Sequence, residues 1–400
     1  MKSGCVIILL CLATIGCSMP YKGPLIEPEK ATIAGIKEAL SSKPELVDVL
    51  LIHGVGYHDQ QWAADANAAL AQALGRKFDR DVFLKQKGED LPNRGVLYSA
   101  RLDGGTGQVN TYAIVWAPVV KEWKQTLCYD ASVTVPGVCD DAKALNTKTR
   151  ARFNGSLKSA MLDGALSDAI FYISPEGGRL LRKTVRAGAL IAFAGGHAYS
   201  RDDDEKAFKA MADRAEVPLF MMSESLGSKI LRDTLIEMSS EDGEERQKNL
   251  LLAVGRIQEI YMAANQIPLL SPTAESSPSL TTHYSKRDWR ELYPKQPSLS
   301  GLRGLGAMVH EGRRLGNKKN QNLPLRIVAF SDPNDLLTYA LRPYLNDPDL
   351  LDIVDVTVSN DWTYFGLLED PWRAHTTYWA SPAVETILRC GYGPQSAGCK

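Results

Sequence analysis

Hydrophobic and polar positions follow two different spacings along the chain, and together they predict strands that alternate with helices. Seven runs have the length and apolar content of strands: 46–52, 95–102, 111–116, 217–222, 259–264, 325–330 and 354–358. Four segments have the helical spacing of apolar residues: 30–40, 59–74, 227–238 and 381–389. This alternation predicts an α/β protein with a mostly parallel, doubly wound sheet and helices on both of its faces.

Composition restricts the class of protein further. The chain has 400 residues, of which 44% are hydrophobic and 23% charged, and these values are typical of globular proteins. Lys and Arg number 46 against 47 Asp and Glu, so the chain lacks the basic surplus that binding to nucleic acid requires. No apolar run reaches the roughly 18 residues of a membrane span, which excludes a polytopic membrane protein.

The N-terminus has the pattern of an export signal. The apolar stretch from Val6 to Ile15 would be only about 15 Å long as a helix, half the thickness of a bilayer core. It therefore predicts the core of a signal peptide, which we place at residues 1–17, and not an anchor helix. Residues 18–29 contain prolines and are expected to form a tether.

Cys17 follows the small residue Gly16 at the end of this core, and the arrangement resembles a bacterial lipoprotein signal. The resemblance implies that Cys17 is diacylated, becomes the new N-terminus and anchors the protein in the cell envelope. Ser18 next to it implies sorting to the outer membrane. Thr14 departs from the family, which usually has Leu, Val or Ile there. The alternative is an ordinary secretory signal that is cut nearby.

Four cysteines lie outside the signal, and they allow three pairings. The two local pairs, Cys128–Cys139 and Cys390–Cys399, are the simplest choice, and an oxidising compartment favours disulfides over free thiols. No pair or cluster of Cys and His has the spacing of a zinc site, so we expect neither a metal nor another cofactor.

The sharpest local motif lies where the apolar run 217–222 meets the helical segment 227–238. The sequence there is Ser223-Glu224-Ser225-Leu226-Gly227, which resembles the G-x-S-x-G nucleophile elbow of the α/β-hydrolase superfamily. Ser223 replaces the first glycine, and its small side chain meets the same steric demand. The resemblance implies that Ser225 is a catalytic nucleophile. The same letters also occur at ordinary strand–helix turns, because Ser caps helices and Gly tolerates unusual dihedral angles.

A serine hydroxyl needs a histidine base that is oriented by a carboxylate, and in this superfamily the three follow in the order Ser, acid, His. His375 lies in an expected loop between the last strand and the last helix. The strand 325–330 ends in a turn with two carboxylates, Asp332 and Asp335. The superfamily pattern favours Asp335, which is followed by apolar residues. Asp332 is suited to accept backbone N–H bonds in the turn and is the alternate acid.

Backbone N–H groups must also stabilise the oxyanion that forms during acyl transfer. In the superfamily one donor follows the nucleophile, which is Leu226 here. The other comes from a loop after an early strand, and His53-Gly54-Val55-Gly56 resembles that loop. The resemblance makes Val55 the second donor, with His53 as a structural residue that holds the loop.

These motifs together resemble secreted esterases and lipases of the α/β-hydrolase superfamily. We expect one hydrolase domain at 30–400, with an insertion at about 117–214 that forms a helical cap stapled by Cys128–Cys139. The resemblance implies a serine hydrolase that cleaves a small-molecule or lipid ester through an acyl-enzyme. Thioester, amide and acyl-transfer chemistry stay open. The alternative is a non-catalytic envelope lipoprotein that uses the same fold for binding or scaffolding.

Overall fold

A nine-stranded sheet lies at the centre of the computed structural model. The structure describes residues 17–18, 24–41, 45–131, 134–135, 137–140, 151–196, 204–239, 243–270, 297–316, 321–342, 349–364, 367–394, 396 and 399. The strands, in order across the sheet, are β2 (Leu25–Glu27), β11 (Leu351–Thr357), β10 (Leu325–Ser331), β9 (Ile257–Ala263), β8 (Leu219–Glu224), β4 (Leu46–Ile52), β7 (Gln108–Val115), β6 (Val96–Leu102) and β5 (Glu89–Asp90).

The six strands from β11 to β7 are parallel to one another, and antiparallel pairs occur only at the two edges of the sheet. The mostly parallel α/β sheet predicted from the alternation of strands and helices is therefore confirmed. Because parallel strands end at the same edge, the residues that follow β4, β8 and β10 are brought close to one another.

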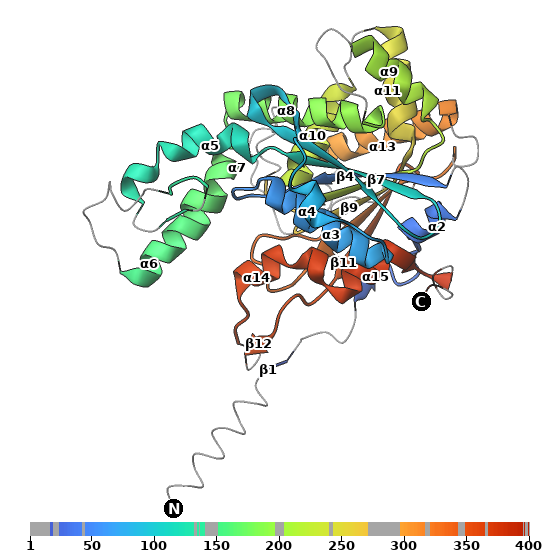
Figure 1. Ribbon diagram of the computed structural model, residues 1–400. Helices are drawn as coiled ribbons and strands as arrows, with labels where there is room; N and C mark the ends of the chain where they lie inside the picture. Colours follow the sequence, from blue (N-terminus) through green and yellow to red (C-terminus); the bar gives the residue numbers. More distant parts are fainter. Residues whose placement is uncertain are drawn as a thin grey trace, which may run out of the picture.

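Two layers of helices cover the sheet, as Figure 1 shows. One face is covered by α8 (Pro175–Phe193), α9 (Asp204–Asp213), α10 (Leu226–Met238), α11 (Glu244–Gly255) and α13 (Pro297–Gly316). The other face is covered by α2 (Ile36–Leu40), α3 (Gln60–Leu74), α4 (Arg80–Phe83) and α15 (Pro382–Cys390). Strand β4 shows why both layers form, because Val49 packs into one core and Leu50 into the other.

The expected insertion at 117–214 consists of two parts. Its first part contains α5 (Ala117–Gln125), α6 (Arg152–Leu157), the π-helical segment η4 (Lys158–Leu166) and α7 (Ser167–Ile173), and it projects sideways from the sheet (Figure 1). We call the described residues of 117–173 the arm. Helices α8 and α9 instead pack into the core over the sheet, because their apolar faces are buried there. The projecting part is therefore shorter than the sequence pattern indicated.

Three expectations near the N-terminus have different outcomes. The helix expected at 30–40 begins only at Ile36, because Ile33 and Ala34 form strand β3, which pairs with β13 (Gly391–Tyr392). The range expected as a tether, 18–29, includes the edge strand β2. The signal-peptide segment lies outside the described residues, apart from the backbone of Cys17, which belongs to the short strand β1 (Cys17–Ser18).

Both local cysteine pairs are confirmed as disulfides. Cys128–Cys139 closes a loop inside the arm, and Cys390–Cys399 ties the C-terminal residues to the end of α15. Within the described ranges, no helix is both long and apolar enough to cross a membrane.

Candidate active site

Ser225 occupies a strained turn between a strand and a helix. β8 ends at Glu224 and α10 begins at Leu226, so Ser225 alone joins them, with φ 50° and ψ −126°. A positive φ is uncommon for a residue with a side chain, and such strain is typical of functional sites. Ser223, which stands where the superfamily has glycine, is fully buried, and its Oγ lies 2.9 Å from Oγ of Ser228.

Gly54 and Gly227 allow this turn to lie close to the loop after β4. A Cβ atom on Gly227 would lie 2.2 Å from the carbonyl oxygen of His53, and one on Gly54 would lie 2.8 Å from Cβ of Ser225. Contacts this short do not occur for real Cβ atoms, so both positions require glycine. The turn at Ser225 and the loop after β4 therefore interlock through backbone contacts.

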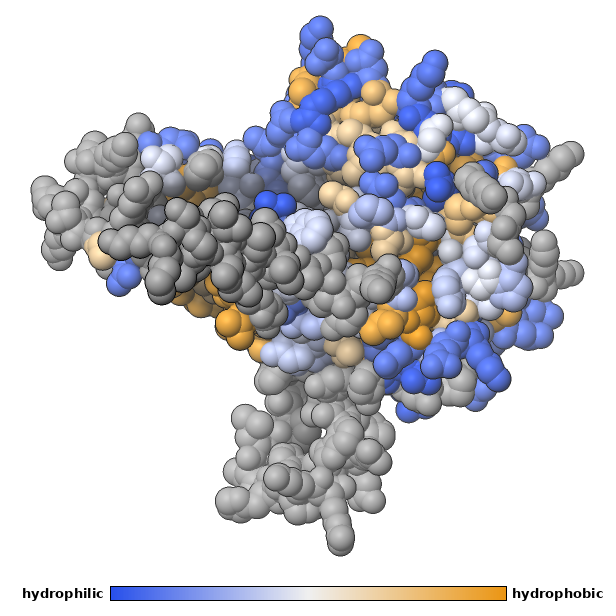
Figure 2. Space-filling view, turned by 90° about the horizontal axis from the view of Figure 1, so that it is seen from below, coloured by the Kyte–Doolittle hydropathy of each residue, from blue (hydrophilic) through white to orange (hydrophobic). Residues whose placement is uncertain are grey.

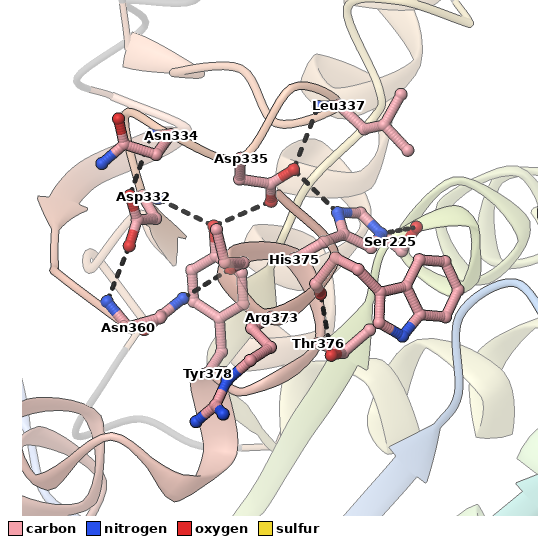
Figure 3. Close-up of polar contacts among 12 residues, drawn as sticks. Ser225, Asp332, Asn334, Asp335, Leu337, Asn360, Arg373, His375, Thr376 and Tyr378 are labelled. Atoms are coloured by element: carbon pink, nitrogen blue, oxygen red, sulfur yellow. Dashed lines mark hydrogen bonds and ion pairs between the residues drawn. The ribbon is translucent and has the colours of Figure 1, made fainter. Parts of the chain in front are cut away.

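The structure brings Ser225, His375 and Asp335 into one chain of hydrogen bonds (Figure 3). Nε2 of His375 lies 3.0 Å from Oγ of Ser225, and Nδ1 lies 2.8 Å from Oδ1 of Asp335. All three residues are nearly fully buried. Because Oδ1 of the carboxylate is an acceptor, Nδ1 carries the proton, and Nε2 is left to accept the serine hydroxyl.

His375 belongs to a short helix, α14 (Pro371–Thr376), and not to the loop that we expected. The Asp370 side chain accepts the backbone N–H groups of Trp372 and Arg373, and Pro371 occupies the first helical position. Both features favour the start of a helix. The helix fixes the direction in which the His375 ring points.

Asp332, the alternate acid, has a different set of partners. Its two oxygens accept the backbone N–H groups of Asn334 at 2.9 Å and Asn360 at 2.6 Å, as Figure 3 shows. Burial raises the pKa of Asp332, and these hydrogen bonds oppose the increase. The geometry places Asp335, and not Asp332, against His375.

Tyr378 also belongs to this arrangement, although the sequence motifs did not single it out. Its hydroxyl donates to Oδ2 of Asp335 at 2.9 Å and accepts the backbone N–H of Asp332 at 2.7 Å. The side chain is fully buried, and burial raises its pKa well above the usual value. Tyr378 lies just beyond the end of α14, in the short 3₁₀ segment η8 (Tyr378–Ala380), and its nearness to His375 in the chain is the only sequence signal of this role.

His53 holds the loop after β4. Its Nε2 accepts the backbone N–H groups of Trp116 and Ala117 at 3.0 and 3.2 Å, and its Nδ1 lies 2.8 Å from the carbonyl oxygen of Gly54. A ring with these partners is neutral, and burial lowers the pKa of His53 well below 6.5. His53 therefore has the contacts of a structural residue and does not contact Ser225 through its ring.

The two expected oxyanion donors flank Ser225. Leu226 is the first residue of α10, where N–H groups have no partner inside the helix. Val55 lines the same cavity as Ser225. The neighbouring N–H group of Gly56 is engaged, because it donates to Oδ2 of Asp168 at 2.6 Å.

Asp168 links this loop to the arm. It lies on α7 and forms a buried ion pair with Lys124 of α5, with 2.6 Å between Oδ1 and Nζ. The Lys124 ammonium also donates to the carbonyl oxygen of Gly164 at 2.8 Å. Burial raises the pKa of Asp168 to about 6, and the charge of Lys124 opposes that increase. The arm is thus anchored directly beside Val55.

A cavity of about 740 Å³ opens above Ser225 and His375. Its walls come from the loop after β4, from α3, from α14 and from the arm, which contributes Lys124, Ser156 and Ser159. Glu224 lies in the wall directly beside Ser225, and burial raises the pKa of its carboxyl to about 7. This volume is typical of a pocket for a small organic ligand.

The arrangement contains a base, an oriented nucleophile and nearby N–H donors, and this combination can support acyl transfer. Among the described residues, no group of three or more His, Cys, Asp or Glu side chains could hold a metal ion. Comparison with protein-family models and with curated proteins finds no match to this chain.

Proposed function

We propose that this protein is a serine hydrolase of the α/β-hydrolase type that cleaves carboxylic esters. The observation that carries the proposal is the chain of hydrogen bonds from Ser225 through His375 to Asp335, at the base of a cavity. Strands and helices alone do not distinguish an enzyme from a binding protein with the same fold. The aligned nucleophile, base and acid support the enzyme, because a strained serine in contact with a histidine is an arrangement that nucleophilic catalysis requires and binding alone does not.

The proposed reaction has two stages. Oγ of Ser225 attacks the ester carbonyl while Nε2 of His375 takes its proton, and the resulting oxyanion accepts N–H bonds from Val55 and Leu226. The imidazolium then returns the proton to the departing alcohol, which leaves an acyl group on Ser225. Water attacks this acyl-enzyme with His375 again as base, and the carboxylic acid is released. The Asp335 side chain holds Nδ1 of His375 and stabilises the imidazolium whenever it forms.

A fluorophosphonate probe tests this proposal directly. Oγ of an activated serine displaces fluoride from phosphorus and forms a stable covalent adduct, which mass spectrometry detects. We expect the unaltered protein to be labelled and Ser225→Ala to remain unlabelled. Ser223→Ala is the matched control. Ser223 lies two residues before Ser225, and its hydroxyl shares a hydrogen bond with the hydroxyl of Ser228, so this variant should still be labelled. Absence of labelling in the folded, unaltered protein would favour the non-catalytic scaffold.

We also propose that the protein is exported and anchored through a lipid on Cys17. The sequence of the first 17 residues supports this, and the two disulfides support an oxidising compartment. Incorporation of labelled fatty acid tests it. The unaltered protein should incorporate the label and Cys17→Ala should not. Incorporation that survives Cys17→Ala would reject Cys17 as the lipidated residue, and no incorporation by either protein would favour an ordinary secretory signal.

A further inference from the structure

The arm carries an unusual stripe of exposed apolar side chains. Six large apolar residues along the helix formed by α6, η4 and α7 are between 42% and 50% exposed: Leu157, Met161, Leu162, Leu166, Ile170 and Ile173. Four buried positions on the same helix are polar, namely Ser159, Asp163, Ser167 and Asp168, and they alternate with the smaller or aromatic buried residues Ala165 and Tyr172. The large aliphatic side chains of this helix therefore face outward while several polar ones face inward, which is unusual for a helix of a soluble protein.

The π-helical segment explains how the stripe stays on one face. Leu157 and Leu162 are five residues apart, as are Met161 and Leu166. In an α-helix such a spacing turns successive side chains away from a common face, whereas one turn of a π-helix joins residues i and i+5. η4 spans Lys158–Leu166, so the local geometry aligns these side chains. π-helical turns are rare and are frequently found at functional sites.

A second set of exposed apolar side chains lies just before α14 in the chain. Trp362 and Tyr364 are 54% and 53% exposed, and Leu367 and Leu368 are 88% and 68% exposed. Trp372 of α14, which follows this cluster in the chain and is 44% exposed, lines the cavity, as do Ser156 and Ser159 of the arm. The helix that carries the stripe and the segment that carries the second cluster therefore both reach the cavity. Figure 2, which views the molecule from below, shows hydrophobic side chains exposed along the arm.

The position of strand β1 indicates what lies against the second cluster. β1 pairs with β12 (Thr363–Tyr364), and Cys17 is the partner of Tyr364 in this pairing. The residue proposed to carry the lipid anchor therefore lies beside the second cluster. A lipid anchor at this position brings the second cluster to the membrane to which it is attached.

We propose that the arm stripe and the Trp362–Trp372 cluster form a surface that lies against a lipid bilayer, with the cavity mouth between them. Leu and Ile side chains favour the acyl region, whereas Trp and Tyr favour the boundary between acyl chains and headgroups. This surface orients the mouth toward the bilayer, so an ester-bearing lipid reaches Ser225 without crossing bulk water. The inference rests on the proposed ester hydrolysis and the proposed anchor.

Depth-dependent fluorescence tests the orientation on the full, anchored chain. An environment-sensitive fluorophore is attached to a single added cysteine in Leu166→Cys, in Leu367→Cys, or in the control Lys248→Cys on α11. Lys248 is exposed, and α11 lies far from the arm (Figure 1). Each protein is inserted into phosphatidylcholine vesicles with or without brominated acyl chains. We expect a blue shift and several-fold stronger quenching by the bromolipids at positions 166 and 367 than at 248.

Equal quenching at all three positions, or none at 166 and 367, would overturn the proposal. Shielding of position 166 that increases with protein concentration without vesicles would also overturn it, in favour of a second copy of this chain. The same three variants are treated with the fluorophosphonate probe. Their labelling reports ester-hydrolase chemistry separately, so failure of membrane docking and failure of the proposed function are distinguishable.

Discussion

The hydroxyl of Tyr378 joins Asp335 to the backbone of Asp332. It donates to Oδ2 of the first residue and accepts the N–H of the second, so one buried group fixes the whole turn after β10. Oδ1 of Asp335 is consequently left for His375 and for the N–H of Leu337. The orientation of the proposed base thus depends on a phenol that does not touch it.

We expect Tyr378→Phe to reduce both stability and turnover. The change leaves Oδ2 of Asp335 and the N–H of Asp332 buried without this partner, which costs about 1–3 kcal/mol for each unsatisfied group. Without this hydrogen bond the carboxylate of Asp335 orients His375 less well, which should lower kcat. KM should change little, because Tyr378 does not line the cavity. Urea unfolding and ester kinetics measure the two effects. Tyr129→Phe, at a 72% exposed site, is the control and should change neither.

Substitutions of the two carboxylates in the turn after β10 should have different effects, one on turnover and the other on stability. Asp335→Asn disrupts the carboxylate that orients His375, and we expect turnover to fall by about 10⁴ with the fold intact. Asp332→Asn places an amide against the N–H of Asn334 or Asn360, so it should mainly cost stability, about 1 kcal/mol for one lost hydrogen bond. Ester kinetics and urea unfolding of both variants test this expectation. If Asp332→Asn loses turnover and Asp335→Asn loses only stability, the roles of the two carboxylates must be exchanged.

Glu224 should make substrate preference depend on pH. Its pKa is raised to about 7, so the carboxyl beside Ser225 is neutral below that pH and charged above it. We expect kcat/KM for an ester with an anionic acyl group, relative to a neutral one, to fall by up to about tenfold as the pH rises through 7. Glu224→Gln should remove this change. A ratio that falls equally in that variant would assign the effect to another group.

The buried pair of Lys124 and Asp168 should stabilise the arm only as a pair. Asp168→Asn keeps an acceptor for the N–H of Gly56 but leaves the Lys124 ammonium buried without its anion, so we expect a loss of about 3–5 kcal/mol. Adding Lys124→Met should restore most of that loss. Urea unfolding of the two variants measures this, and a double variant no better than Asp168→Asn would contradict the expectation.

The same pair predicts a pH dependence of stability. The pKa of Asp168 is about 6 in the folded protein and 3.8 in the unfolded chain, so the folded state binds the proton more tightly. The stabilisation that comes from proton binding at Asp168 is therefore complete below about pH 3.8 and is lost as the pH rises through about 6. The difference in unfolding free energy between the unaltered protein and the double variant should decrease over that interval.

The sequence predicted the central strands and the residues at their ends because both follow from local patterns. Ser225 and His53 follow closely after apolar runs, and parallel strands bring such positions to one edge of the sheet. Tyr378 and Asp168 could not be predicted in this way. Asp168 is 112 residues from Gly56 in the chain, and only the path of the arm makes them neighbours. The sequence pattern also groups α8 and α9 with the projecting helices, although both pack over the sheet, because helical spacing does not reveal against which part of the protein a helix packs.

Two glycines determine how close the loop after β4 lies to Ser225. Gly54 and Gly227 lack the Cβ atoms that would lie 2.8 Å from Cβ of Ser225 and 2.2 Å from the carbonyl oxygen of His53. An added methyl group at either position would push the loop after β4 away from Ser225, and with it Val55, one of the two proposed oxyanion donors. We therefore expect differences in substrate size to be accommodated by the other walls of the cavity, which come from α3, α14 and the arm.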